Sequence, residues 1–232
     1  MRNFIEKLLK HYHQRTSSMK SKKGFTLIEL MIVITIIGVL ASLLLPMITG
    51  AQRATYKAKT KTLFSSLVAG LNRYKDEYGF YPNFLTEKDR VNLNDASNSV
   101  NCVRALTGRN PDGTAMSAAD RMAVNRNKIH ILDFDDSNLI EKRNRTTNKN
   151  EWKIVDAFGN PNIYICVDND GDGLIKKGFP TATDGVNPVD LKNAVKNDKV
   201  GIRAGAIVFT LKKDSNSPAA DFTSEDIFSW VQ

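Results

Sequence analysis

The stretch K-K-G-F-T-L-I-E-L-M-I-V-I-T-I-I-G-V-L-A, residues 22–41, decides the fold of this chain. It changes from basic to apolar at Gly24, and a single carboxylate, Glu29, lies just inside the apolar run. That run extends to residue 48 and would measure about 36 Å as a helix, longer than the ~30 Å hydrocarbon core of a bilayer. A secretory signal peptide would have a shorter run with the small residues after it, whereas here the glycine comes first. The sequence therefore predicts a transmembrane helix over residues 25–48.

The positive charge of the chain is concentrated in one flank. The 232 residues carry a formal net charge of +8. Residues 1–24 contain seven Lys or Arg and one acid, a net +6, which leaves about +2 for everything after Gly24. Because the excess charge belongs to a flank, we expect no nucleic-acid partner. The positive-inside rule places residues 1–24 in the cytoplasm and the C-terminal bulk on the exported side.

Helical periodicity continues beyond the apolar run and predicts one helix from about residue 26 to 79. Apolar residues in its second half form a single stripe, so that half is amphipathic. Pro46 has no amide hydrogen and should kink the junction between the halves. The expected regions are a leader over residues 1–24, a transmembrane and filament-core helix over 25–48, an amphipathic half-helix over 49–82 and an exported globular domain over 83–232.

The sequence pattern of the exported region predicts short helices followed by strands. One long helix followed by a run of strands is an α+β pattern, in which the helix packs against a small antiparallel sheet. The patterns predict short helices near residues 100–106 and 117–125, and strands over 128–134, 152–157, 162–167 and 205–211.

The opening motif K-G-F-T-L-I-E, residues 23–29, resembles the type III signal of the type IV pilin superfamily. The resemblance implies that a prepilin peptidase removes residues 1–24 by cutting after Gly24, and that the new terminus, Phe25, becomes N-methylated. It also implies a single-pass protein of the bacterial inner membrane, with its N-terminus cytoplasmic and its C-terminal domain periplasmic.

Three further stretches are similar to the major pseudopilin of type II secretion. They are L-N-R-Y-K-D-E-Y-G-F-Y-P at residues 71–82, D-A-F-G-N-P at 156–161 and E-D-I-F-S-W at 225–230. The resemblance implies a structural subunit rather than an enzyme, with related pseudopilins and an inner-membrane assembly platform as partners. The segment 83–151 is longer than in the usual major pseudopilin, which leaves open a major pseudopilin, a minor one or a lineage-specific relative. Within the superfamily, a type IV or competence pilin is the alternative. A membrane-anchored, calcium-dependent adhesin or binding module is the alternative from another class.

Glu29 is costly in a membrane because a carboxylate loses its hydration there. After cleavage the α-amine of Phe25 is a cation at the same depth, one helical turn away, and can offset that cost. The amine of a neighbouring subunit can be reached equally well, and the family resemblance implies that second pairing. The alternative is a carboxylate that stays solvated at headgroup depth.

The stretch D-N-D-G-D-G-L-I, residues 168–175, has the opening of an EF-hand calcium loop. Its twelfth position is Phe179 rather than glutamate, so another acid must complete the site. The alternative is a turn whose aspartates bond their own backbone. The predicted Ca²⁺ ligands are Asp168, Asp170, Asp172, the carbonyl of Leu174, and Asp184. The family resemblance implies a second candidate site at Asp214, Asp221 and Asp226.

The two cysteines, Cys102 and Cys166, both lie in the exported part, where they can form a disulfide or remain buried free thiols. Only His130 among the three histidines survives removal of the leader. Nothing in the sequence orders a cysteine with this histidine for thiol catalysis, and no glycine-rich phosphate loop follows a strand. We therefore expect no catalytic site.

Overall fold

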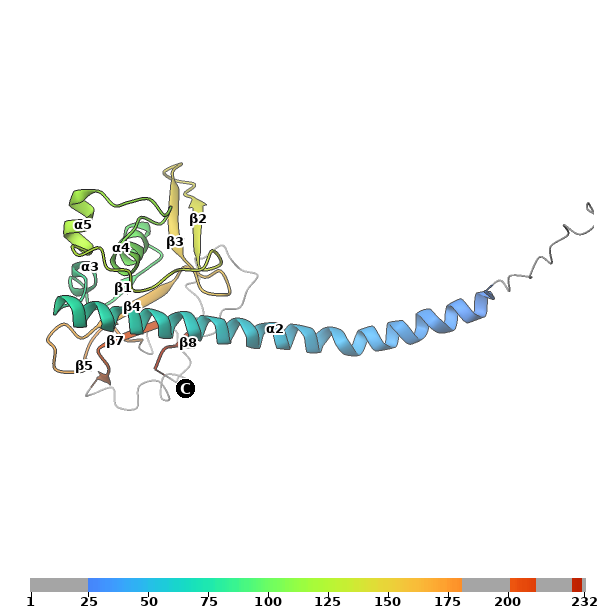
Figure 1. The fold of residues 1–232 in the computed structure, drawn as a ribbon. Coiled ribbons are helices and arrows are strands. Elements are labelled where there is room, and N and C mark those ends of the chain that lie inside the picture. Colours follow the sequence, from blue (N-terminus) through green and yellow to red (C-terminus); the bar gives the residue numbers. More distant parts are fainter. Residues whose placement is uncertain (1–24, 181–200, 212–226, 231–232) are drawn as a thin grey trace, which may run out of the picture. The chain divides into compact units, whose positions relative to one another are not determined.

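The computed structural model describes residues 25–180, 201–211 and 227–230, apart from the side chains at 43–47. The chain divides into two compact units, residues 1–50 and residues 51–232. A long helix, α2 (Leu27–Tyr78), contributes its first half to one unit and its second half to the other. Figure 1 shows this helix and the labelled elements that follow it.

The first half of α2 presents apolar side chains all round. Ile28, Met31, Ile34 and Ile37 are each more than half exposed, on successive turns of the helix. Such an all-round apolar helix is stable only where other apolar groups surround it. Within the described part of the chain, no helix is both long enough and apolar enough to span a membrane, so the predicted span over residues 25–48 stays a prediction.

The end of α2 matches the prediction closely. Gly79 adopts a left-handed φ of 80°, and its amide donates to the Lys75 carbonyl at 2.7 Å. A residue without a side chain adopts this conformation at no steric cost, which is why the helix stops there. The helix assignment is continuous through Pro46, and the predicted kink stays a prediction.

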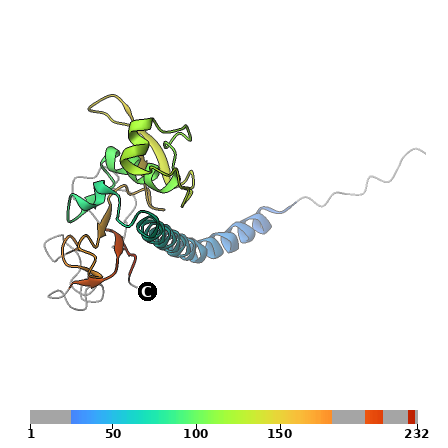
Figure 2. The same cartoon turned by 60° about the vertical axis from the view of Figure 1, so that its left-hand side comes forward.

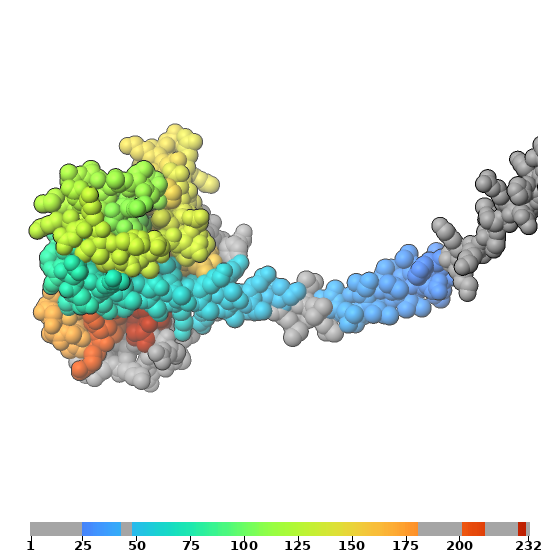
Figure 3. Space-filling view, in the orientation of Figure 1, coloured from blue at the N-terminus to red at the C-terminus, as the bar shows by residue number. Residues whose placement is uncertain are grey.

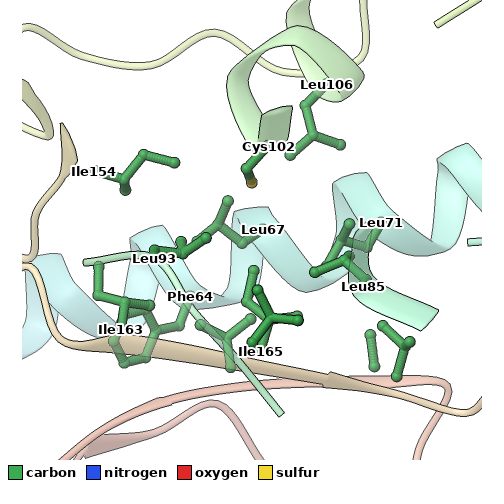
Figure 4. Packing of buried hydrophobic residues seen from close by; sticks show 14 of the residues in the cluster. Phe64, Leu67, Leu71, Leu85, Leu93, Cys102, Leu106, Ile154, Ile163 and Ile165 are labelled. Carbon is green, nitrogen blue, oxygen red and sulfur yellow. The ribbon is translucent and has the colours of Figure 1, made fainter. Parts of the chain in front are cut away.

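The amphipathic half of α2 supplies the centre of the second unit's core. Phe64, Leu67 and Leu71 are fully buried and lie against side chains from the following helices and strands (Figure 4). Their spacing of three and four residues places them on one face of the helix. The predicted α+β fold, a helix packed with a small antiparallel sheet, is therefore confirmed.

A four-stranded antiparallel sheet with the order β1-β4-β7-β8 forms the base of this unit. Its strands are β1 (Val91–Asn92), β4 (Ile163–Val167), β7 (Ala206–Thr210) and β8 (Ile227–Phe228). Two separate two-stranded ribbons pair β2 (Leu139–Arg143) with β3 (Asn150–Ile154), and β5 (Leu174–Ile175) with β6 (Ile202–Arg203). The sequence prediction found β3, β4 and β7 and missed the rest, most of them only two residues long.

The two faces of β4 contribute to two different clusters. Ile163 and Ile165 belong to the cluster around α2, whereas Cys166 belongs to a second cluster with Phe209 and Phe228. This division follows from the alternation of side chains along a strand. Cys102, on α4 (Ala96–Thr107), is buried in the first cluster, so the two thiols face different cores.

Of the two alternatives for the cysteines, the structure therefore favours buried free thiols over a disulfide. Both cysteines are buried free thiols, and burial raises the pKa of each to about 12. A thiol held protonated in this way is a poor nucleophile and a poor redox partner.

Residues 83–154, apart from β1, which belongs to the sheet, cover the flank of α2 opposite the sheet. Figures 2 and 3 show this segment in green to yellow on one side of the helix and the later strands in orange to red on the other. It contains α3 (Asn83–Thr86), α4, α5 (Ala118–Val124) and the β2–β3 ribbon. The two predicted short helices correspond to α4 and α5, ended by left-handed Gly108 and begun by a Ser117 cap, respectively.

The predicted strand over residues 128–134 is wrong. The amides of Ile131 and Leu132 both donate to the Leu106 carbonyl at the end of α4, at 2.8 and 3.1 Å. The segment is therefore extended because it is tied to a helix end, and no strand among the described residues pairs with it. The alternating apolar pattern does not distinguish these two situations.

Asn125 organises this flank from a fully buried position. Its amide donates to the carbonyls of Ala105 and Ile129 at 3.0 and 2.8 Å, and its oxygen accepts from the Ile129 amide and the Tyr78 hydroxyl, each at 2.8 Å. One side chain thus connects the end of α2 to α4 and to the segment after α5. Because the buried Asn125 amide forms its hydrogen bonds only when these segments are placed correctly, it favours this one arrangement of the segments.

Candidate functional site

Thr26 and Glu29 form a reciprocal cap at the start of α2. Glu29 Oε2 accepts from the Thr26 amide at 2.9 Å and from its hydroxyl at 2.8 Å, while the Glu29 amide donates to Thr26 Oγ1 at 3.3 Å. This is a capping box, which satisfies amides that have no partner within the helix. The T-x-x-E spacing of Thr26 and Glu29 is itself a sequence signal of such a cap, a role for Glu29 beside that of a charge in the membrane.

The cap leaves Glu29 available to a second partner. Its bonds with Thr26 involve a single carboxylate oxygen, Oε2. Phe25 is 82% exposed beside it. Pairing between Glu29 and the Phe25 amine of a processed chain stays a prediction, and Gly24 lies outside the described residues.

The second candidate site is the acidic loop between β4 and β5. Carboxylate oxygens of Asp168, Asp170 and Asp172 lie within 4.8 Å of one another. Asp168 is buried and accepts the amides of Gly171 and Gly173, each at 2.9 Å. The loop thus closes on its own first aspartate, as the alternative interpretation of a self-bonded turn expects.

Cations of the protein also face this loop. Lys176 donates to Asp170 at 2.9 Å and contacts Asp172 as well, and hydrogen bonding to the lysine lowers the pKa of Asp170 to about 2. The same contacts, first that with Asp172, raise the pKa of Lys176. Lys75, on α2, lies 3.9 Å from Asp168. The loop therefore holds a cationic group already, and a metal ion would have to displace Lys176.

Of the other predicted calcium ligands, Leu174 lies among the described residues. Leu174 begins β5, and its amide donates to Asp172 at 2.9 Å. Phe179, at the twelfth position, packs beside the second cluster. Four predicted ligands lie outside the described residues, namely Asp184, Asp214, Asp221 and Asp226.

The D-A-F-G-N-P turn contains a buried carboxyl group that the sequence pattern did not indicate. Asp156 is 1% exposed, and its Oδ1 accepts the amides of Phe158 and Asn160 at 2.9 and 2.8 Å. Its other oxygen, Oδ2, accepts no hydrogen bond from any described residue. Burial raises the pKa of Asp156 to about 6, against the opposing effect of the two amides. The turn is anchored to α2, because the Ala157 amide donates to Thr60 Oγ1 at 3.2 Å.

His130 lies in an exposed ion pair rather than beside a cysteine. Its Nδ1 is 3.1 Å from the Thr107 carbonyl and its Nε2 is 3.1 Å from Asp133. These two hydrogen bonds, first that with Thr107, raise the pKa of the imidazole. Both cysteines are buried elsewhere, so the arrangement offers no thiol for this histidine to activate.

Comparison with known proteins bears on the N-terminal helix. Residues 19–45 match the family model described as the prokaryotic N-terminal methylation motif. Type II secretion system core protein G of Klebsiella pneumoniae is 39% identical over 64 residues, which cover 28% of this chain and 46% of that protein. The Escherichia coli K12 protein of the same name is 43% identical over 61 residues, covering 26% and 42%. That of Vibrio cholerae is 36% identical over 64 residues, covering 28% and 44%.

These matches have a limited extent. The chain spans less than half the length of the curated relatives that it matches, and no solved structure matches it. The matched segment includes the Thr26–Glu29 cap and the apolar half of α2. This chain therefore carries the prokaryotic N-terminal methylation motif of a prepilin, and is similar to type II secretion system core protein G, a pseudopilin.

Proposed function

We propose that this chain is a pseudopilin-like structural subunit of a type II secretion filament. The match of residues 19–45 to the methylation motif carries the proposal, because this range includes the predicted cut site after Gly24, the predicted new terminus Phe25, and Glu29. The chain would be made as a precursor and held in the inner membrane by the apolar half of α2. Its work would be mechanical: α2 helices of successive subunits pack together while the second unit stays outside the membrane.

The partners follow from this role. A prepilin peptidase would remove residues 1–24 and methylate Phe25, and an inner-membrane assembly platform would add the subunit to identical or related pseudopilins. The curated similarity to core protein G of type II secretion supports this branch over a type IV or competence pilin. The exposed apolar side chains of residues 27–40 support packing between helices.

The direct test of the proposal is the mass of the mature N-terminus. Co-expression with a prepilin peptidase should yield a chain that begins at Phe25 and carries one methyl group, about 14 Da, by intact mass spectrometry. Gly24→Trp should leave the precursor uncut, because a bulky side chain prevents close approach of the backbone to the peptidase. Gly50→Ala is the matched control, since a Cβ at Gly50 meets no atom within 4 Å. A mature chain from Gly24→Trp, or an uncut wild-type chain, would contradict the proposal.

Two further measurements separate the alternatives. Loss of protein secretion without loss of pili in a deletion strain supports the secretion filament, and the reverse pattern favours a type IV or competence pilin. A disulfide formed between cysteines introduced beside Phe25 and beside Glu29 on different subunits would require polymerisation. Its absence would favour a membrane-anchored binding module.

We also propose that the acidic loop binds Ca²⁺ through Asp168, Asp170 and Asp172, with the Leu174 carbonyl as a further ligand. The donor set fits, because oxygens at 2.3–2.6 Å from one ion lie within roughly 5 Å of one another, as these carboxylates do. Bound calcium would supply positive charge that holds the loop closed. The structure supplies Lys176 in that role, so the ion and the lysine compete.

Melting of the full chain in detergent tests the calcium site. About 1 mM Ca²⁺ should raise Tm by roughly 2–5 °C over chelator, because an ion that binds only the folded state stabilises it. The Asp170→Asn, Asp172→Asn double variant should lose this shift, and Lys176→Met should enlarge it. Asp135→Asn, Asp136→Asn is the control, another exposed acidic pair in a turn.

The remaining outcomes distinguish the two loops. A shift that survives in the Asp170, Asp172 variant would assign calcium to the loop that contains Asp214, Asp221 and Asp226. The lack of any shift in the wild-type chain, with no heat of binding by calorimetry, would reject both calcium sites.

A further inference from the structure

A cavity of about 800 Å³ lies in the flank formed by α4, α5 and the segment after them. Its walls come from the end of α4, the loop that follows it, α5 and residues 128–133 (elements labelled in Figure 1). This flank belongs to the region that is longer than in a usual major pseudopilin. The match to core protein G covers 28% of the chain.

Cationic side chains dominate the lining. Arg109 follows α4, Arg121 is on α5 and Lys128 lies in the segment after α5, so three separate elements each contribute a positive charge. Among the described residues, no carboxylate lies within the 4.0 Å ion-pair limit of any of the three. The acid in the lining, Asp133, pairs with His130 instead.

The neighbouring carboxylate, that of Asp120, also has partners of its own. Asp120 pairs with Arg104 at 2.9 Å and accepts the Ser117 hydroxyl at 2.7 Å. The lining therefore carries three cationic side chains, those of Arg109, Arg121 and Lys128, against one carboxylate, that of Asp133. An isolated cation on the surface is solvated by water and screened by salt. Three cations around one cavity attract anions together and raise their local concentration.

The walls of the cavity are held in place by buried and local hydrogen bonds. Arg104 donates to Asn110 Oδ1 at 2.8 Å, and the backbone amide of Asn110 donates to the Thr114 carbonyl at 3.0 Å, which closes the loop after α4. Gly108 has a left-handed φ of 70°, and a Cβ there would meet the Ile129 carbonyl oxygen at 3.1 Å. Lys128 also has a positive φ, 55°, and its amide donates to the Asn125 carbonyl. The backbone that carries the three cations is thus organised before any ligand arrives.

We propose that this cavity binds an acidic segment of another protein, whose carboxylates lie against Arg109, Arg121 and Lys128. An inorganic ion would fill little of the volume, since a water molecule occupies only about 30 Å³, whereas cavities of this size hold ligands as large as a few amino-acid residues. Met116 adds apolar surface suited to a peptide backbone and its methylenes. No Phe, Tyr or Trp is among the described residues of the lining, so the stacking platform that single-stranded nucleic acid requires is lacking there. This inference does not depend on the proposed polymerisation.

Fluorescence polarisation of the full chain in detergent, with fluorescein-labelled hexaglutamate as the probe, tests the proposal. Hexaglutamate should bind and hexaglutamine should not. Arg109→Gln, Arg121→Gln and Lys128→Gln should each raise Kd about threefold, and any two together about tenfold, as expected for partly solvated charge pairs. Arg126→Gln is the matched control, because Arg126 is exposed close by and does not line the cavity.

A second measurement uses the wild-type chain alone. Carbodiimide joins carboxylates to nearby amines, so hexaglutamate should become linked to Lys128 and not to the exposed Lys142 or Lys149, as mapped by mass spectrometry. Equal binding of hexaglutamate and hexaglutamine, equal weakening by Arg126→Gln, or a link formed only at the other lysines would each overturn the proposal. So would tighter binding of a labelled oligothymidine that is lost in the same variants, which would assign the cavity to nucleic acid.

Discussion

Replacing Glu29 by glutamine should leave the chain processed and inserted but should reduce filament yield at least about tenfold. The reason is that a buried carboxylate is stabilised by pairing with a cation, here the Phe25 α-amine of a neighbouring subunit, and neutral glutamine cannot form this ion pair. Glutamine is informative because its amide oxygen can still accept the Thr26 amide and hydroxyl that Glu29 Oε2 accepts now. A capping box works with either residue. The variant therefore separates the charge of Glu29 from its role in starting α2.

The complementary variant is Thr26→Val, which keeps the charge of Glu29 and removes the hydroxyl that bonds it. This variant should assemble nearly as well as the wild-type chain. The measurements are the fraction processed, by intact mass, and the filaments sheared from cells that over-produce the subunit. Normal assembly of Glu29→Gln would show that pairing with an amine is not required. Equal failure of both variants would indicate that the cap geometry, rather than the charge, limits assembly.

Replacing Asp156 by asparagine should abolish a pH dependence of stability worth about 3 kcal/mol. Burial raises the pKa of Asp156 from 3.8 to about 6, and each unit of difference between folded and unfolded states corresponds to about 1.4 kcal/mol. Below about pH 3 the Asp156 carboxyl is protonated in both the folded and the unfolded state, so it does not change stability. Between about pH 3 and pH 7 the unfolded chain loses this proton more readily than the folded chain, so the folded state loses stability as the pH rises. Above about pH 7 the carboxyl is ionised in both states, and the loss is complete and constant.

The measurement is the difference in unfolding free energy between Asp156→Asn and the wild-type chain, followed in detergent by the fluorescence of Trp152 and Trp230. That difference should grow in favour of the variant by about 3 kcal/mol between pH 3 and pH 7. Any constant effect of the new amide group cancels in this comparison. Asp135→Asn is the control, because Asp135 bonds a backbone amide in the same way but is exposed. Parallel stability curves for Asp156→Asn and the wild-type chain would show that the carboxyl is not held in a protonation-sensitive site.

The sequence by itself determined the elements whose signals are local. The apolar run, the 3.6-residue stripe and the terminating glycine were enough to predict α2 within a residue at each end, since helix hydrogen bonds join residues four apart. The N-terminal methylation motif, which matches residues 19–45, was recognisable in the sequence for the same reason, since its residues are close together along the chain. The α+β class followed from the order of patterns along the chain.

Only the tertiary structure decided the features that join distant segments. It assigned Cys102 and Cys166 to different clusters, tied the supposed strand at residues 128–134 to the end of α4, and buried one carboxyl oxygen of Asp156 without a hydrogen-bonding partner among the described residues. It also brought Arg109, Arg121 and Lys128 around one cavity. Each of these outcomes depends on which surfaces meet when α2 is covered from both sides. Burial, pairing and the pKa of a side chain are set by those neighbours, and the spacing of residues along the chain does not specify them.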